Sequence, residues 1–137
     1  ASNDINVCGH LGLQPQLVID SSDYKIQGRD KDSAESIMSD AILLESLGIS
    51  VLVLECIPSD LARNVSSKIG IPTIGIGAGN GCDGQVLVSY DMLGIISGRQ
   101  PRFVRNFMSS EDSIALAVSA FVREVKAGTF PSENESY

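Results

Sequence analysis

The sequence has no tryptophan, one histidine and three cysteines in 137 residues, and it lacks the features of several protein classes. No apolar run approaches the roughly 20 residues of a membrane-spanning helix, and no segment resembles a signal peptide. An odd number of cysteines without a Cys-x-x-Cys pair indicates reduced thiols in a cytoplasmic protein. A net charge of -7 disfavours a nucleic-acid partner, which requires clustered positive charge.

What the chain does have is an alternation of short apolar runs and amphipathic segments. The runs predict strands over residues 5–8, 49–54, 71–76 and 84–90, and the amphipathic segments predict helices over 34–47, 60–69 and 109–126. Asp32 or Ser33 is the expected cap of the first helix. Near-continuous apolar strands, buried on both faces, indicate a parallel sheet covered by helices. The acidic tail, residues 131–137, is expected to be poorly ordered.

Two parallel architectures fit this pattern, an open doubly wound sheet and part of a (β/α)8 barrel. Three or four strands are about half of what a complete barrel of ~250 residues contains. The stretch between residues 76 and 84 is too short to hold a helix, unlike a regular crossover between parallel strands. In both architectures, reacting groups lie at the carboxyl ends of the strands.

Glu55 directly follows the apolar run Val51–Leu54, so it is a candidate for acid–base chemistry. A carboxylate at the end of a buried strand is partly desolvated, which raises its pKa and makes it a better proton acceptor near neutral pH. The alternative is a structural ion pair between Glu55 and a lysine or arginine.

His10 is the only histidine and stands between glycines in Cys8-Gly9-His10-Leu11-Gly12. Flanking glycines allow the backbone to approach a ligand closely, and an imidazole there could hydrogen-bond a carbonyl or carboxylate group. The alternative is a histidine satisfied by backbone groups at a turn. A metal role is disfavoured, because a mononuclear site needs several ligands.

The segment Gly75–Gly81 is glycine-rich but does not match a phosphate-binding loop. The Gly-x-Gly-x-x-Gly spacing fails at Asn80 or Cys82, and no P-loop lysine is present. The favoured interpretation is that small residues leave room for a small ligand beside the strand.

Arginines at 99, 102 and 105 could meet an anionic group, although a solvated face or ion pairs with acidic residues explains them better. Cys8 and Cys56 lie in apolar runs and are predicted to be buried. Cys82 lies in a predicted loop.

Five segments, taken in order, resemble the ketopantoate hydroxymethyltransferase family. They are Val7–Leu13 with Pro15-Gln16, Tyr24–Arg29, Leu52–Pro58, Ile71–Asn80 and Asp83–Val88. The resemblance covers nearly the whole chain. It implies the C-terminal half of a (β/α)8 TIM barrel of the phosphoenolpyruvate/pyruvate type, with about strands 5 to 8 in residues 1–130, and a homo-oligomer that is a decamer in the family.

The resemblance also implies an activity, the transfer of a hydroxymethyl group from 5,10-methylenetetrahydrofolate to 3-methyl-2-oxobutanoate with Mg2+. The product, ketopantoate, lies on the route to pantothenate. The residue matching the family's general base is Glu55, and the residue matching the histidine beside the keto acid is His10. The apolar residues matching those around its branched end are Ile76, Val86 and Val88.

The resemblance places the metal-binding acids, and a lysine that contacts the substrate, in the N-terminal half of the barrel. No metal ligand is therefore expected in this chain, and that half is an expected partner. The sequence departs from the family pattern at Ser22 and Asp23, where glycines are usual, and at Glu135, where a histidine is usual. Two alternatives stay open: a non-catalytic half-barrel that serves binding or assembly, and a folate-independent C–C lyase of the same barrel group.

Overall fold

The computed structural model describes residues 5–17, 24–96, 98 and 100–137. Its centre is a four-stranded, all-parallel sheet with the strands in chain order: β1 (Cys8–Gly12), β2 (Val51–Glu55), β3 (Thr73–Ile76) and β4 (Gly84–Gln85). The prediction of a parallel α/β fold is therefore confirmed. The departures at Ser22 and Asp23 lie outside the described residues.

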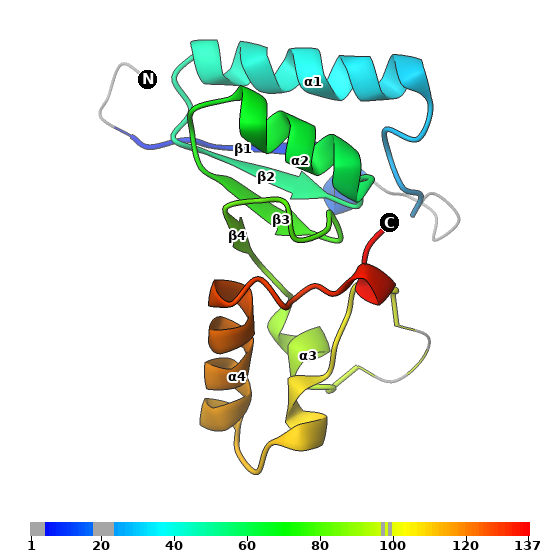
Figure 1. The fold of residues 1–137 in the computed structure, drawn as a ribbon, viewed down its shortest axis with the longest axis vertical. Coiled ribbons are helices and arrows are strands. Elements are labelled where there is room, and N and C mark those ends of the chain that lie inside the picture. Colours follow the sequence, from blue (N-terminus) through cyan, green and yellow to red (C-terminus); the bar gives the residue numbers. More distant parts are fainter. Residues whose placement is uncertain (1–4, 18–23, 97, 99) are drawn as a thin grey trace.

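Two helices cover one face of the sheet, α1 (Lys31–Ser46) and α2 (Ser59–Lys68) (Figure 1). A short helix α3 (Ser89–Met92) and a longer helix α4 (Ile114–Lys126) lie on the other side, beyond β4 (Figure 1). Three 3-10 turns complete the described structure: η1 (Pro15–Leu17), η3 (Phe107–Ser110) and η4 (Glu133–Glu135). No helix among these residues is long and apolar enough to cross a membrane.

Apolar side chains of β2 divide the core into two clusters. Leu52 and Leu54 are fully buried and pack toward α1 and α2, whereas Val53 points the other way, toward a second cluster. That second cluster contains Phe103, Phe107 and other aromatic and aliphatic residues from the C-terminal half of the chain. Burial alternates along β2: Leu52 and Leu54 are buried, whereas Val51 and Val53 are half-exposed. The prediction that this strand is buried on both faces is therefore wrong for the described chain.

The first predicted strand is displaced, because β1 begins at Cys8 rather than ending there. Its limits follow pairing with β2, from Cys8 opposite Val51 to Gly12 opposite Glu55. His10 therefore lies within a strand and not in the turn after it. Cys8 is exposed, contrary to the prediction, because in the described chain β1 pairs with β2 on one side only; Cys56 is buried as predicted.

Helix boundaries differ from the prediction where a different residue provides the cap. Asp30 caps α1 by accepting a hydrogen bond from the Ser33 amide at 2.9 Å. Ser113 caps α4, while Ser109 and Ser110 belong to η3. An N-cap side chain must accept from the first-turn amides, so the polar residue just before the helix takes this role. Gly48, with a φ of 84°, follows α1 in the left-handed conformation that is common just after a helix.

The strand predicted over 84–90 is much shorter, because only Gly84 and Gln85 form β4 and α3 begins at Ser89. The stretch from Gly77 to Asp83 contains no helix, as predicted. The tail prediction is wrong: η4 forms in it, and Glu135 completes a capping box with Ser132. Glu135 also forms an ion pair with Arg105, which holds the tail in place.

Candidate active site

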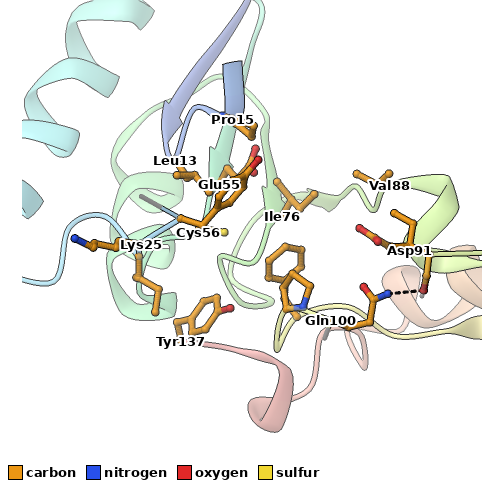
Figure 2. Close-up of a pocket in the computed structure, with 15 residues that line it drawn as sticks. Leu13, Pro15, Lys25, Glu55, Cys56, Ile76, Val88, Asp91, Gln100 and Tyr137 are labelled. Atoms are coloured by element: carbon orange, nitrogen blue, oxygen red, sulfur yellow. Dashed lines mark hydrogen bonds between the residues drawn. The ribbon is translucent and has the colours of Figure 1, made fainter. Parts of the chain in front are cut away.

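A pocket of about 1020 Å³ opens at the carboxyl ends of the strands. Glu55 and Ile76, the last residues of β2 and β3, line it (Figure 2). The other lining residues come from the loops after the strands, from α3 and from the tail: Leu13, Pro15, Tyr24, Lys25, Ile26, Cys56, Val88, Asp91, Ile96, Gln100, Pro101, Phe103 and Tyr137. This is the edge of a parallel sheet where ligand sites are expected.

Three neighbouring segments hold the backbone around Glu55. The Glu55 carbonyl accepts a hydrogen bond from the Leu13 amide at 2.8 Å, and the Cys56 amide donates to the Ile76 carbonyl at 2.9 Å. The Cys56 carbonyl accepts from the Gln27 amide at 2.9 Å. Cys56 has a φ of 50°, in the left-handed region that non-glycine residues rarely adopt. The turn after β2 is thus fixed on both sides, and with it the position of the Glu55 side chain.

His10 lies beside Glu55, with its Nε2 atom 3.1 Å from Oε2 of the carboxylate. The two side chains are 30% and 14% exposed, so the contact is partly screened from water. The two atoms lie within hydrogen-bonding distance, and Nε2 has no other partner among the described atoms. The alternative of a Glu55 ion pair with lysine or arginine is not what the structure shows.

Burial raises the pKa of Glu55 above its ordinary value, and the neighbouring His10 partly offsets this increase. A partly desolvated carboxylate that holds a proton more tightly is a better base in its charged form near neutral pH. Burial also raises the pKa of the adjacent Cys56 thiol to about 12, so this cysteine is protonated and a poor nucleophile. Of the two neighbours Glu55 and Cys56, the Glu55 carboxylate is therefore the candidate proton acceptor.

The three apolar residues expected around the branched end of the keto acid, Ile76, Val86 and Val88, lie in different environments. Ile76 is buried and Val88 is 48% exposed, and both line the pocket. Val86 is 43% exposed and is not among the lining residues. His10 also does not line the pocket, and it reaches the site through Glu55.

The glycines that were expected to admit a ligand are in contact with protein atoms instead. A Cβ atom on Gly77 would lie 2.7 Å from the Phe103 ring, and one on Gly79 would lie 2.3 Å from the Ser59 Cβ. Beside His10, a Cβ on Gly12 would lie 2.1 Å from the Glu55 carbonyl oxygen. The interpretation of open space beside the strand is therefore wrong. These glycines permit close packing around the pocket.

No group of three or more histidine, cysteine, aspartate or glutamate side chains that could hold a metal ion occurs within the described ranges. The described residues therefore do not fit a resident metal centre.

Several lining residues were missed by the sequence reasoning, among them Phe103, Asp91 and Tyr137. They follow no strand directly and reach the pocket through tertiary packing, so spacing along the chain gives no signal for them. The arginine pattern is explained in part: Arg105 forms ion pairs with Glu124 and Glu135, as the favoured alternative predicted. Arg102 donates to the Asn134 carbonyl at 2.7 Å, and Arg99 lies outside the described residues.

A sequence model of the family described as ketopantoate hydroxymethyltransferase matches residues 1–133. The chain belongs to this family. Relatives named 3-methyl-2-oxobutanoate hydroxymethyltransferase include a protein of Ruthia magnifica subsp. Calyptogena magnifica, which is 59% identical over 136 residues, covering 99% of this chain and 52% of that protein. A protein of Buchnera aphidicola subsp. Schizaphis graminum is 48% identical over 137 residues, covering 100% of this chain and 52% of its own length.

A further relative, named 3-methyl-2-oxobutanoate hydroxymethyltransferase 2, comes from Pseudomonas fluorescens strain Pf-5; it is 52% identical over 134 residues, covering 97% of this chain and 50% of that protein. The chain thus spans about half the length of the curated relatives it matches. Membership of the ketopantoate hydroxymethyltransferase family agrees with the parallel α/β fold. A complete barrel is not part of the described structure.

Proposed function

We propose that this chain provides the proton-abstracting half of a hydroxymethyltransferase site that converts 3-methyl-2-oxobutanoate to ketopantoate. The position of Glu55 is the observation that carries the proposal. It is a desolvated carboxylate at the carboxyl end of a central strand, on the wall of a pocket, in a chain of this family. The one-carbon donor in this proposal is 5,10-methylenetetrahydrofolate.

In the proposed reaction, the Glu55 carboxylate removes the proton from C3 of the keto acid. The electron pair left on C3 delocalises into the keto group as an enolate. The enolate then forms the new carbon–carbon bond with the one-carbon unit of the folate donor. Water cleaves both C–N bonds to this unit before the attack, which releases tetrahydrofolate and leaves formaldehyde; the aldehyde carbon bonds to C3, and its oxygen takes a proton to give the hydroxymethyl group.

The neighbours of Glu55 have separate proposed roles. His10, 3.1 Å from the carboxylate, would orient it. A contact of His10 with the polar end of the keto acid is proposed on the strength of the family resemblance, since His10 does not line the pocket. Ile76 and Val88 would border the branched apolar end, since both line the pocket. Val86 is proposed for the same role on the strength of the family resemblance, and it would need to turn toward the ligand from its exposed position.

We further propose that the remainder of the relatives' length completes a (β/α)8 barrel and supplies the metal ligands. Two observations support this. The chain aligns with only half of each relative, and large apolar side chains such as Val7, Val86 and Val88 are exposed, which is unfavourable unless another element covers them. Mg2+ would stabilise the enolate when bound, but the described residues do not hold it, so no step above depends on it.

Exchange of the C3 proton of 3-methyl-2-oxobutanoate into deuterated water tests the role of Glu55 without requiring the folate donor. In the complete enzyme, Glu55→Gln should abolish this exchange, because an amide cannot accept the proton. Glu35→Gln is the matched control; it removes a carboxylate that is 67% exposed on α1, and it should leave exchange unchanged. Exchange at the wild-type rate in Glu55→Gln would exclude Glu55 as the base.

The same preparation separates the alternatives. An intact mass spectrum under denaturing conditions shows whether a second polypeptide of about half-barrel length accompanies this one. Binding of the keto acid without exchange would favour a non-catalytic module. Carbon–carbon bond formation or cleavage without the folate donor would favour a lyase of the same barrel group.

A further inference from the structure

Arg105 holds the tail from Pro131 to Tyr137 through Glu135, in addition to the hydrogen bond from Arg102 to the Asn134 carbonyl. The Arg105 guanidinium donates from Nε and Nη2 to the two carboxylate oxygens of Glu135, both at 2.6 Å, and it also pairs with Glu124. It lies over the Phe107 and Phe130 rings, 5.3 Å and 5.0 Å from their centroids. A forked, stacked arrangement of this kind requires arginine, because lysine cannot form both hydrogen bonds.

The electrostatics of this attachment favour the charged forms of both partners. Hydrogen bonds from Arg105 and Ser132 outweigh the effect of burial and hold the pKa of Glu135 below its ordinary value. The hydrogen bond to Glu135 is also the main cause that raises the pKa of Arg105. The attachment is therefore fully formed at neutral pH.

The far end of the tail is attached to α2. Its first residue, Ser59, donates hydrogen bonds from both its amide and its Oγ to the Tyr137 carbonyl, each at 2.8 Å. Pro58, the N-cap residue of α2, provides no side-chain cap, so this carbonyl satisfies an amide that the helix cannot pair internally. Figure 1 shows the tail crossing from the end of α4 toward α2.

The side chain of Tyr137, the residue attached to Ser59, lines the pocket. It lines the cavity together with Glu55, Cys56 and Ile76 (Figure 2), and it meets the Phe103 ring edge-on at a centroid distance of 6.3 Å. Burial raises the pKa of Tyr137, so the phenol is neutral near pH 7.

We infer that residues 131–137 form a strap, held by Arg105, that places Tyr137 as a substrate-positioning residue on the pocket wall. The inference rests on the proposed function for the identity of the ligand, 3-methyl-2-oxobutanoate. The ring supplies an aromatic contact to the apolar part of the keto acid and does not exchange a proton with it. If the strap detaches from Arg105, the Tyr137 ring leaves the pocket wall, even though the side chain itself is unchanged.

Kinetics of the complete enzyme test the positioning role. Tyr137→Ala should raise KM for the keto acid about tenfold, the effect of losing one good aromatic contact, and change kcat by less than about twofold. Tyr137→Phe keeps the ring and should retain the wild-type KM. Tyr90→Ala is the control, since Tyr90 is 58% exposed and does not line the pocket. An unchanged KM in Tyr137→Ala would overturn the positioning role.

A double variant tests the strap. Arg105→Gln should raise KM by a similar factor, and Arg105→Gln combined with Tyr137→Ala should be no worse than either single change, because both remove the same wall. Effects that multiply would show that Arg105 acts elsewhere.

A spectroscopic readout keeps this test separate from the proposed activity. The chain has no tryptophan, so Tyr137→Trp introduces a fluorophore at the strap. Its emission should be that of a partly buried indole and should shift to the red when Arg105→Gln is added, whereas Tyr90→Trp should emit as an exposed indole in both backgrounds. An emission wavelength at position 137 that does not change when Arg105→Gln is added would overturn the inference that Arg105 holds the strap. If the shift occurs but the keto acid is not turned over by wild-type enzyme, the proposed function fails and the strap stands.

Discussion

Gly12→Ala would place a methyl group where β1 ends against the backbone of Glu55. Gly12 is paired with Glu55 in the parallel register and has a φ of 90°. The added Cβ would lie 2.1 Å from the Glu55 carbonyl oxygen and 2.8 Å from Cγ2 of Ile57. Real Cβ atoms do not approach backbone oxygens this closely, so the two strand ends must separate.

Two costs add at this position. A side chain in the positive-φ region costs about 1–2 kcal/mol, and forcing an extra carbon into a packed region costs about 1–3 kcal/mol more. The expected loss in the free energy of unfolding is therefore about 2–5 kcal/mol. Gly48→Ala isolates the first cost, because Gly48 has a φ of 84° and nothing within 4 Å of the added atom. That variant should lose only about 1–2 kcal/mol.

Urea denaturation of wild type, Gly12→Ala and Gly48→Ala measures both losses in one experiment. A further consequence concerns the site: because the clash is with the carbonyl of Glu55, proton exchange by the complete enzyme should fall in folded Gly12→Ala but not in Gly48→Ala. Equal losses of stability in the two variants would refute the reasoning, since the contact with Glu55 would then contribute nothing.

Two further predictions concern charge and thiol chemistry. Because burial raises the folded-state pKa of Glu55, its contribution to stability is greatest below the unfolded value of about 4.3 and is lost as pH rises through the folded value. Wild type should therefore lose stability relative to Glu55→Gln as pH rises above about 4 in urea titrations, whereas Glu35→Gln should show the same pH dependence as wild type. Thiol labelling of the isolated chain at pH 8 should modify the exposed Cys8 first and Cys56 last, because Cys56 is buried and its pKa is about 12. Equal labelling rates in the folded chain would contradict the burial of Cys56, and protection of Cys8 in the complete enzyme would support the proposed companion half.

Glu55 could be found from the sequence because the signal is local. Four apolar residues in a row predict a strand, and the first polar residue after it must lie at the sheet's carboxyl edge. The strand β2 was therefore located to within two residues of its observed start, and the candidate base was identified with it. The order of the four strands and of α1, α2 and α4 was predictable for the same reason, whereas α3 lies where a strand was predicted.

The rest of the pocket depends on contacts that a one-dimensional pattern does not contain. Tyr137 meets α2 through Ser59, which precedes it by 78 residues, so no spacing rule connects them. The glycines of residues 75–81 were misinterpreted because a glycine in the sequence does not show whether a ligand or a neighbouring residue fills the space beside it. The limits of β1 were missed because pairing with β2, and not the apolar pattern, sets them.

The contact between Gly77 and the Phe103 ring has a consequence for how this part of the chain can vary. Any side chain at position 77 would collide with the ring at 2.7 Å, so a change there is accepted only with a smaller residue at position 103. At Gly79 the added atom would lie 2.3 Å from the Cβ of Ser59, which every residue except glycine carries, so only glycine at position 59 would remove that contact. Substitutions at these positions should therefore appear in pairs among related sequences, and a designer who alters one member of a pair must alter the other.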